Sequence, residues 1–110
     1  MGLETFPEIE SFQRLPHRVI VKGGSTSYHA KDGAQLRGIV INNMGQPIKD
    51  LKVNLVIFDE QKIPVYNTSV VPETHHLDQG TIAPFFFQLK DYPKLITDYH
   101  LYADWRFDDG

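Results

Sequence analysis

The chain of 110 residues contains no cysteine. This absence excludes disulfide bonds, thiolate metal sites and cysteine nucleophiles, because each of them needs a thiol. It does not fix the cellular compartment, since exported domains without cysteine are common. A chain of this length is of ordinary single-domain size and can bury a core without covalent crosslinks. Its apolar fraction of 41% and aromatic fraction of 12% are those of a folded domain, and they exclude a disordered chain.

Long apolar runs and blocks of like charge are also missing. No run approaches the roughly 20 apolar residues that cross a bilayer as a helix, so no membrane span is expected within this chain. The start Met1-Gly2-Leu3-Glu4 has neither the basic region nor the apolar stretch of a signal peptide. The formal net charge is −3 and is spread along the chain, which argues against a nucleic-acid partner.

The chain does contain stretches in which every second residue is apolar. In Leu51-Lys52-Val53-Asn54-Leu55-Val56-Ile57, every second residue is apolar, and turn residues follow from Asp59. This pattern predicts a strand with one face in a core. Strands are expected at residues 18–22, 27–31, 36–43, 49–59, 65–71, 81–89 and 97–107. Residues 1–16 are expected to form an N-terminal arm, in which Phe6, Ile9 and Phe12 share one face, and residues 17–110 the folded domain.

Short strands separated by turns, without a long helical period, are typical of a sandwich. The fold class predicted is therefore all-β, an immunoglobulin-like sandwich of two antiparallel sheets with about seven strands. Gly23-Gly24 is expected to end the first strand, and Gly38 to mark a bulge or a close neighbour. Pro84 lacks an N–H group and predicts an edge or a break in its strand. Residues 90–96 are expected to form at most one helical turn, because Pro93 limits it.

Three motifs that follow one another along the chain support the same fold. Residues 38–43 (G-I-V-I-N-N) are similar to a Gly-x-Val-x-Asn strand, and residues 79–85 (Q-G-T-I-A-P-F) to a Pro-Gly-Glu-x-Ala-Pro-Phe stretch. Between them, residues 55–59 (L-V-I-F-D) stand where a Phe-x-Leu-Tyr-Asp motif would be, with only Asp59 identical. From residue 18 to 107 the chain thus resembles the FxLYD family of bacterial and archaeal domains. The resemblance implies an immunoglobulin-like sandwich, usually in exported or membrane-anchored proteins of undefined biochemical role, and it supplies no catalytic residues.

Histidines are the candidate metal ligands. The chain has five of them, at His17, His29, His75, His76 and His100. Imidazole suits zinc or copper, and the adjacent pair His75-His76 lies between two predicted strands. Neighbouring residues of a strand face opposite ways, however, and no His-x-His spacing occurs, so solvated loop histidines are the favoured interpretation. His75 and His76 are kept as weak metal candidates only.

Catalytic motifs are not found. Gly23-Gly24-Ser25-Thr26-Ser27 lacks the Gly-Lys pair and the helix start of a phosphate-binding loop. No Gly-x-Ser-x-Gly elbow occurs either. Asp98 and Asp104 fit the solvated face of a strand better than a calcium loop. We therefore expect no enzyme activity and no cofactor.

Aromatic residues give the remaining candidate sites. In residues 81–89, alternation predicts that Phe85 and Phe87 enter the core while Phe86 faces outward with Ile82. Phe86, Tyr66 and Tyr102 are the predicted partner-binding residues, because an exposed aromatic side chain marks a site where a protein or a neighbouring domain of the same polypeptide docks.

These features predict a non-catalytic binding, spacer or accessory domain of an extracytoplasmic bacterial protein, secreted or membrane-anchored, with a cytoplasmic location left open. Two alternatives remain open at this point. One is a metal-binding accessory domain that uses the histidines, and the other is a structural oligomerisation module. The sequence does not identify the ligand.

Overall fold

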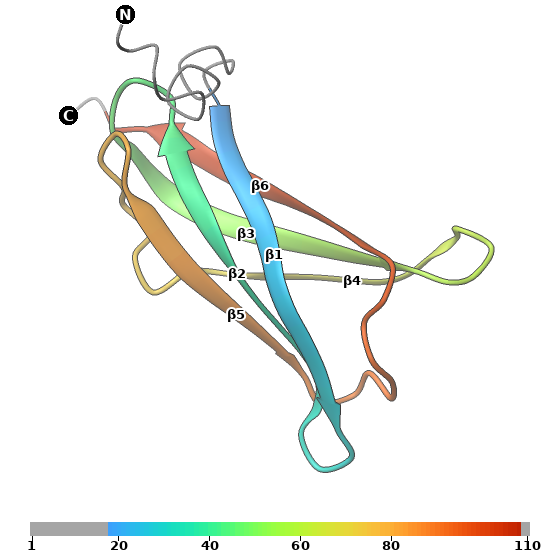
Figure 1. Cartoon of the computed structure of the whole chain (residues 1–110). Coiled ribbons are helices and arrows are strands. Elements are labelled where there is room, and N and C mark those ends of the chain that lie inside the picture. Colours follow the sequence, from blue (N-terminus) through green and yellow to red (C-terminus); the bar gives the residue numbers. More distant parts are fainter. Residues whose placement is uncertain (1–17, 109–110) are drawn as a thin grey trace, which may run out of the picture.

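The computed structural model describes residues 18–108, which form six antiparallel strands and no helix (Figure 1). The strands are β1 (Arg18–His29), β2 (Gly33–Asn43), β3 (Ile48–Phe58), β4 (Pro64–Val70), β5 (Ile82–Leu89) and β6 (Tyr99–Phe107). The order β1-β2-β5 makes one sheet, here called sheet A, and the order β4-β3-β6 makes the other, sheet B. No helix able to span a membrane occurs in this part of the chain. The predicted N-terminal arm lies outside the described residues, and so do its Phe6, Ile9 and Phe12 and the histidine His17.

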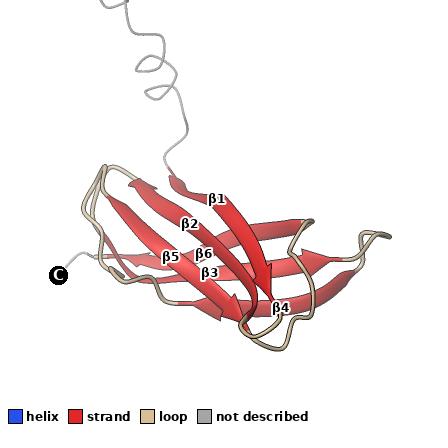
Figure 2. Cartoon of the chain, turned by 60° about the horizontal axis from the view of Figure 1, so that its bottom comes forward, coloured by secondary structure: helices blue, strands red, loops and turns tan. Residues whose placement is uncertain are grey.

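The two sheets pack face to face as the layers of a sandwich (Figure 2). The connections from β2 to β3, from β4 to β5 and from β5 to β6 all pass from one sheet to the other. This order matches strands A, B and E on one sheet and C′, C and F on the other sheet of an immunoglobulin-like sandwich. The predicted fold class is thus confirmed, with six strands in place of about seven.

The difference in strand number arises in β1. The predicted strands at 18–22 and 27–31 are one continuous strand, so Gly23-Gly24 does not end it. The pairing of β1 with β2 shifts between Gly23 and Thr26, and this irregularity absorbs the extra residues. Gly38, on the facing strand, has the backbone oxygen of Lys22 and the ring of Phe85 as close neighbours, as predicted.

The core lies between the sheets and consists of the side chains that alternation places inward. On β5, Phe85 and Phe87 are 4% and 2% exposed, which confirms the predicted alternation of this strand. Among the described strands β5 pairs with β2 alone, so Pro84 does lie on an edge strand of this part of the chain. The fully buried residues with the largest side chains are Leu36, Ile48, Leu51, Leu55, Ile57, Leu77 and Ile96.

The segment between β5 and β6 contains no helical turn, where at most one was predicted for residues 90–96. It forms bends that carry Tyr92 and Ile96 into the core, where they are 6% and 2% exposed. Burial of these two side chains against the sandwich, rather than a local helical period, therefore determines the path of this connection.

Candidate interaction surface

A row of isoleucines crosses all three strands of sheet A on its outer face. Ile20 of β1 lies opposite Ile41 of β2, and Ile41 lies opposite Ile82 of β5. Side chains of directly opposed residues share a face of an antiparallel sheet and contact one another. Ile82 is 57% exposed, while Ile20 and Ile41 are half-buried.

The neighbouring row shows that this face points away from the core. Val21, Val40 and Ala83 are opposed in the same way, and Val40 and Ala83 are completely buried. Because side chains alternate along each strand, the isoleucine row one residue away must face outward.

The apolar surface continues along the strands beyond this row. Ile39 lies opposite Pro84, and Arg37 lies opposite Phe86. We call the surface formed by Ile20, Ile39, Ile41, Ile82, Pro84 and Phe86 the isoleucine face. Lys22, which is opposite Ile39, and Arg37 place two positive charges on or beside it. The isoleucine face is thus an apolar surface with two basic side chains on or beside it.

Phe86 takes the orientation that the sequence predicts. Its neighbours Phe85 and Phe87 point into the core, so Phe86 faces outward on the same side as Ile82 and is half-buried. The guanidinium carbon of Arg37 lies 4.4 Å from the centroid of the Phe86 ring. A cation–π contact of this kind contributes about 0.5–1 kcal/mol at an exposed site. It covers part of the ring and holds the charge of Arg37 at the isoleucine face.

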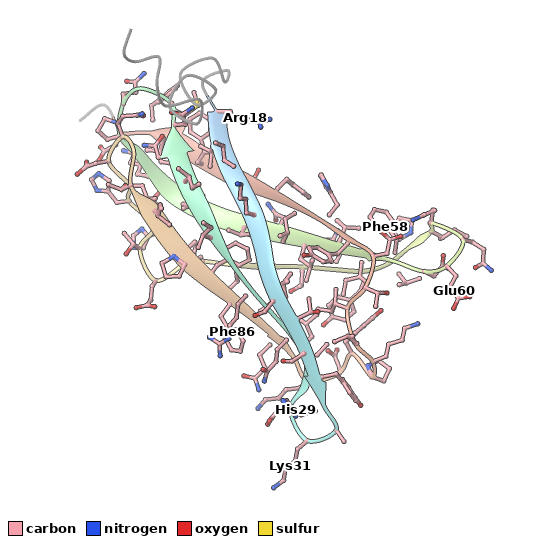
Figure 3. The ribbon with its side chains drawn as sticks, in the orientation of Figure 1. Arg18, His29, Lys31, Phe58, Glu60 and Phe86 are labelled. Carbon is pink, nitrogen blue, oxygen red and sulfur yellow. The ribbon has the colours of Figure 1, made fainter. Side chains whose placement is uncertain are left out.

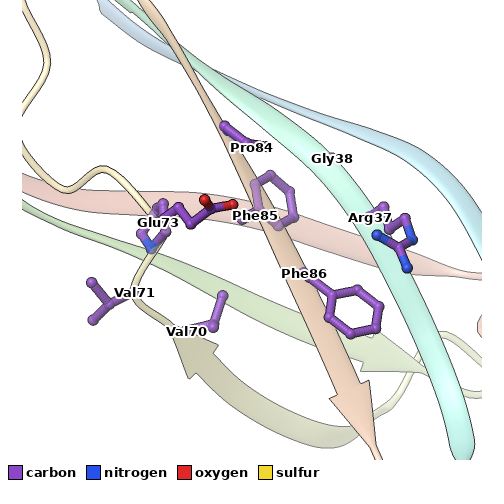
Figure 4. Close-up of a pocket in the computed structure, with 9 residues that line it drawn as sticks. Arg37, Gly38, Val70, Val71, Glu73, Pro84, Phe85 and Phe86 are labelled. Atoms are coloured by element: carbon purple, nitrogen blue, oxygen red, sulfur yellow. The ribbon is translucent and has the colours of Figure 1, made fainter.

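A shallow hollow of about 340 Å³ lies beside Phe86, between β5 and the end of β4. Figure 4 shows Phe86 and Arg37 on one side of this hollow and Val70, Val71 and Glu73 on the other. The hollow extends the apolar surface past the edge of β5 that does not pair with β2. The carboxylate of Glu73 and the guanidinium group of Arg37 lie at its borders.

Tyr66, predicted as a surface aromatic, lies on the inward side of β4. It is opposite the buried Ile57 and packs against the core, with its ring edge-on to Tyr92 at a centroid distance of 5.5 Å. Its hydroxyl donates a hydrogen bond to Oδ1 of Asp91 at 2.8 Å. This bond raises the pKa of Tyr66 above the ordinary value, and partial burial and the negative charge of Asp91 act in the same direction. Tyr66 is thus half-buried and held by a polar contact.

Tyr102 lies on the outer face of sheet B, on the other side of the molecule from Phe86. It is 43% exposed, lies opposite Asn54, and stacks on His100 with 5.9 Å between ring centroids. The structure therefore does not bring Phe86, Tyr66 and Tyr102 together. Each of them lies in a different region of the sandwich.

The two candidate metal ligands point to different neighbours. Nε2 of His76 lies 2.8 Å from Oδ2 of Asp108, whereas His75 borders a separate hollow of about 480 Å³ with Leu51 and Val71. Within residues 18–108, no group of three or more histidine, aspartate or glutamate side chains is placed to hold a metal ion.

Sequence reasoning missed the isoleucine row itself. In Arg18-Val19-Ile20-Val21 and in Ile39-Val40-Ile41, apolar residues follow one another without alternation. Such runs indicate strands that are apolar on both faces. The signal for a second apolar surface was therefore present in β1 and β2, although no local pattern shows that the rows of the two strands are aligned.

Comparisons of the chain with protein-family models, with curated proteins and with solved structures gave no match. The resemblance to the FxLYD family therefore stays a prediction, and the proposal below is based mainly on the surface of the sandwich.

Proposed function

We propose that this domain is a non-catalytic protein-binding module and that the isoleucine face is its binding surface. The observation that carries the proposal is the row Ile20–Ile41–Ile82, which is apolar on a face that the sandwich does not cover. A contiguous exposed apolar surface of this kind marks an interaction site more often than scattered apolar residues do.

Charge defines the kind of partner that fits this surface. Arg18, Lys22 and Arg37 are exposed on the strands of the isoleucine face, and their charges are not neutralised by acidic residues of sheet A. A partner with an apolar centre and acidic residues around it would match the apolar rows and the cations together. Such a partner is a second protein or a neighbouring domain of the same polypeptide.

The setting proposed is an extracytoplasmic bacterial protein, in which the domain is an accessory or spacer unit. The resemblance of residues 38–43, 55–59 and 79–85 to the FxLYD family supports this part of the proposal. The same resemblance implies no catalytic residues, which is consistent with a role in binding.

Site-specific photocrosslinking in the native cells tests the binding surface. A photoreactive phenylalanine analogue replaces Ile82 of the isoleucine face or, as the control, Asn67, which is exposed on the outer face of sheet B. One discrete adduct at position 82 and none at position 67 is the expected result. Equal adducts at both positions, or none at position 82, would contradict the proposal.

Binding of the crosslinked partner, once purified, is then measured by calorimetry. Ile82→Asp is expected to weaken the affinity about tenfold or more, equivalent to about 1.4 kcal/mol, because it puts a charge into the apolar row. Asn67→Asp adds the same charge elsewhere and should leave the affinity unchanged. Loss of binding in both variants would indicate a general charge effect and not a surface.

A further inference from the structure

β6 differs from the other edge strands of the described sandwich in containing neither a proline nor extra residues at a register shift, since the shift in its pairing with β3 adds residues to β3, between Lys49 and Lys52. β5 contains Pro84, β4 starts at Pro64 with a register shift beside it, and β1 has the irregularity after Gly23. Prolines and bulges are devices that keep sheet edges from pairing with another chain. β6 runs through nine residues, Tyr99–Phe107, without proline or glycine. Its edge away from β3 is unpaired within residues 18–108.

The core beside this edge is incompletely covered. A hollow of about 330 Å³ lies between β1 and β6, lined by residues 18–21 and 100–103. Val19, Val21, Leu101 and Ala103 pack against the core there but are only half-buried, whereas the core-facing residues of β3 are completely buried. In an immunoglobulin-like sandwich, a further strand would pair with the strand that corresponds to β6. A strand added at this position would therefore cover the half-buried apolar side chains on the inward side of β6.

We propose that β6 of a second copy of this chain occupies this position, antiparallel to the first β6, so that the two B sheets join into one. The proposal places the two-fold axis at Tyr102, which then lies opposite Tyr102 of the second copy. In that register His100 lies opposite Asp104, so an imidazole ring faces a carboxylate, and Asp98, the residue before β6, lies opposite Arg106. Opposite charges across a strand pair are stabilising, so Asp98 and Arg106 add a contact between the copies to the ion pairs that they make with Lys62 and Asp50 within each copy.

The inward row of β6 fits the same register. Leu101 of one copy lies opposite Ala103 of the other, so a large side chain meets a small one beside the hollow. Tyr99 lies opposite Trp105, so two aromatic side chains meet in the next pair of this row.

The two registers centred on the next residues of β6 are less favourable. A shift that centres the axis on Asp104 sets two carboxylates directly against each other, and like charges in that position are destabilising. A shift to Ala103 sets His100 against Arg106 and loses the pairing of opposite charges. The position of Asp104 on the outer face is set by Asn54, whose Nδ2 donates to Oδ2 of Asp104 at 3.0 Å.

Sedimentation velocity of the full chain over a range of concentrations tests the pairing. The wild type is expected to show a monomer–dimer equilibrium, and Ala103→Lys to raise the dissociation constant about tenfold or more, because an inward charge blocks strand addition. The matched control Ala103→Val keeps an apolar strand former at the same site and should still dimerise, and circular dichroism verifies the fold of each variant. Ile82→Asp, on the isoleucine face, should leave the dimer intact, which separates this test from that of the binding surface.

Oxidative crosslinking gives a second and independent test, because the chain has no cysteine of its own. Opposed residues of an antiparallel pair have Cα atoms about 4.5–5.5 Å apart, within the range of about 4.4–6.8 Å that a disulfide bond spans. Tyr102→Cys should therefore form a disulfide-linked dimer far faster than the control Asn67→Cys. A wild type that is monomeric at every concentration, a dimer dissolved by Ile82→Asp but not by Ala103→Lys, or equal crosslinking at both cysteines would overturn the proposal.

Discussion

The hydroxyl group and the adjoining ring edge of Tyr99 occupy the space that a Cβ atom of Gly23 would take. An ideal Cβ at this glycine would lie 3.0 Å from the ring carbons Cε2 and Cζ of Tyr99. Gly23 belongs to β1 in sheet A and Tyr99 to β6 in sheet B, so this contact connects the two sheets.

Gly23→Ala is therefore expected to destabilise the fold by about 1–3 kcal/mol, because the added methyl group displaces the tyrosine ring. Urea unfolding measures the change. Tyr99→Phe removes the hydroxyl group, so the double variant should lose less stability than the sum of the two single changes. An alanine variant as stable as the wild type would contradict the contact, since alanine is otherwise the better residue in a strand interior.

The turn after β3 provides a second prediction. Oδ1 of Asp59 accepts hydrogen bonds from the backbone N–H groups of Gln61 at 2.8 Å and Ile63 at 3.0 Å. Asp59→Ala is expected to lower the free energy of unfolding by about 1–2 kcal/mol, because both donors lose their partner. Asp59→Asn keeps an oxygen in place and should change the stability by less than about 0.5 kcal/mol. Equal losses in the two variants would mean that charge, and not hydrogen bonding, stabilises the turn. Figure 3 shows the side chain of Glu60, an exposed residue of this turn.

Alternation along the chain was sufficient to predict most strands and their inward faces. Phe85 and Phe87 were assigned to the core correctly because the period of two is a local property of a strand. The continuity of β1 was missed because Gly23-Gly24 looks like a break, and only pairing with β2 shows that the strand resumes at Thr26.

The candidate site was predictable only in part, for the same reason. The outward orientation of Phe86 follows from local alternation, whereas the isoleucine row depends on the registers of two strand pairs that are distant in sequence. Tyr66 was predicted to lie on the surface, but its side chain packs against the core. Its inward position follows from its pairing with Ile57, which no pattern within residues 65–71 reveals.

The Tyr66–Asp91 hydrogen bond has a consequence for stability at alkaline pH. Because the bond and partial burial raise the pKa of Tyr66 in the folded state, the folded protein binds this proton more tightly than the unfolded chain. This contribution to stability is complete below the ordinary tyrosine pKa of 10.0 and is lost as the pH rises through the raised pKa of the folded state.

Ultraviolet or NMR titration of the tyrosines measures this effect. Asp91→Ala should lower the pKa of Tyr66 towards the ordinary value, because it removes both the acceptor and the negative charge. Lys90→Ala, a change at the neighbouring exposed residue, is the matched control. An unchanged pKa in the Asp91 variant would show that the hydrogen bond is not the main cause.

The last prediction concerns Asn42, a completely buried polar residue at the end of β2. Its Nδ2 donates hydrogen bonds to the backbone oxygens of Gln46 at 2.9 Å and Leu77 at 3.0 Å. Its Oδ1 accepts from the N–H group of Met44 at 2.9 Å. One side chain thus connects the β2–β3 turn with the segment that leads to β5.

Asn42→Ala is expected to cost about 2–4 kcal/mol in urea unfolding, because it removes three hydrogen bonds, takes this partner from the N–H group of Met44 and the oxygen of Gln46, and opens a cavity. The oxygen of Leu77 keeps its hydrogen bond from the N–H group of Ile48. Asn42→Asp should cost at least as much, since a carboxylate cannot donate to the two carbonyl oxygens and would be buried as a charge. The exposed Asn67 of β4 is the control, and its alanine variant should remain within about 0.5 kcal/mol of the wild type. If Asn42→Ala were as mild as Asn67→Ala, the loop connection would form without the hydrogen bonds of Asn42, and the two backbone hydrogen bonds between Ile48 and Leu77 would have to hold it instead.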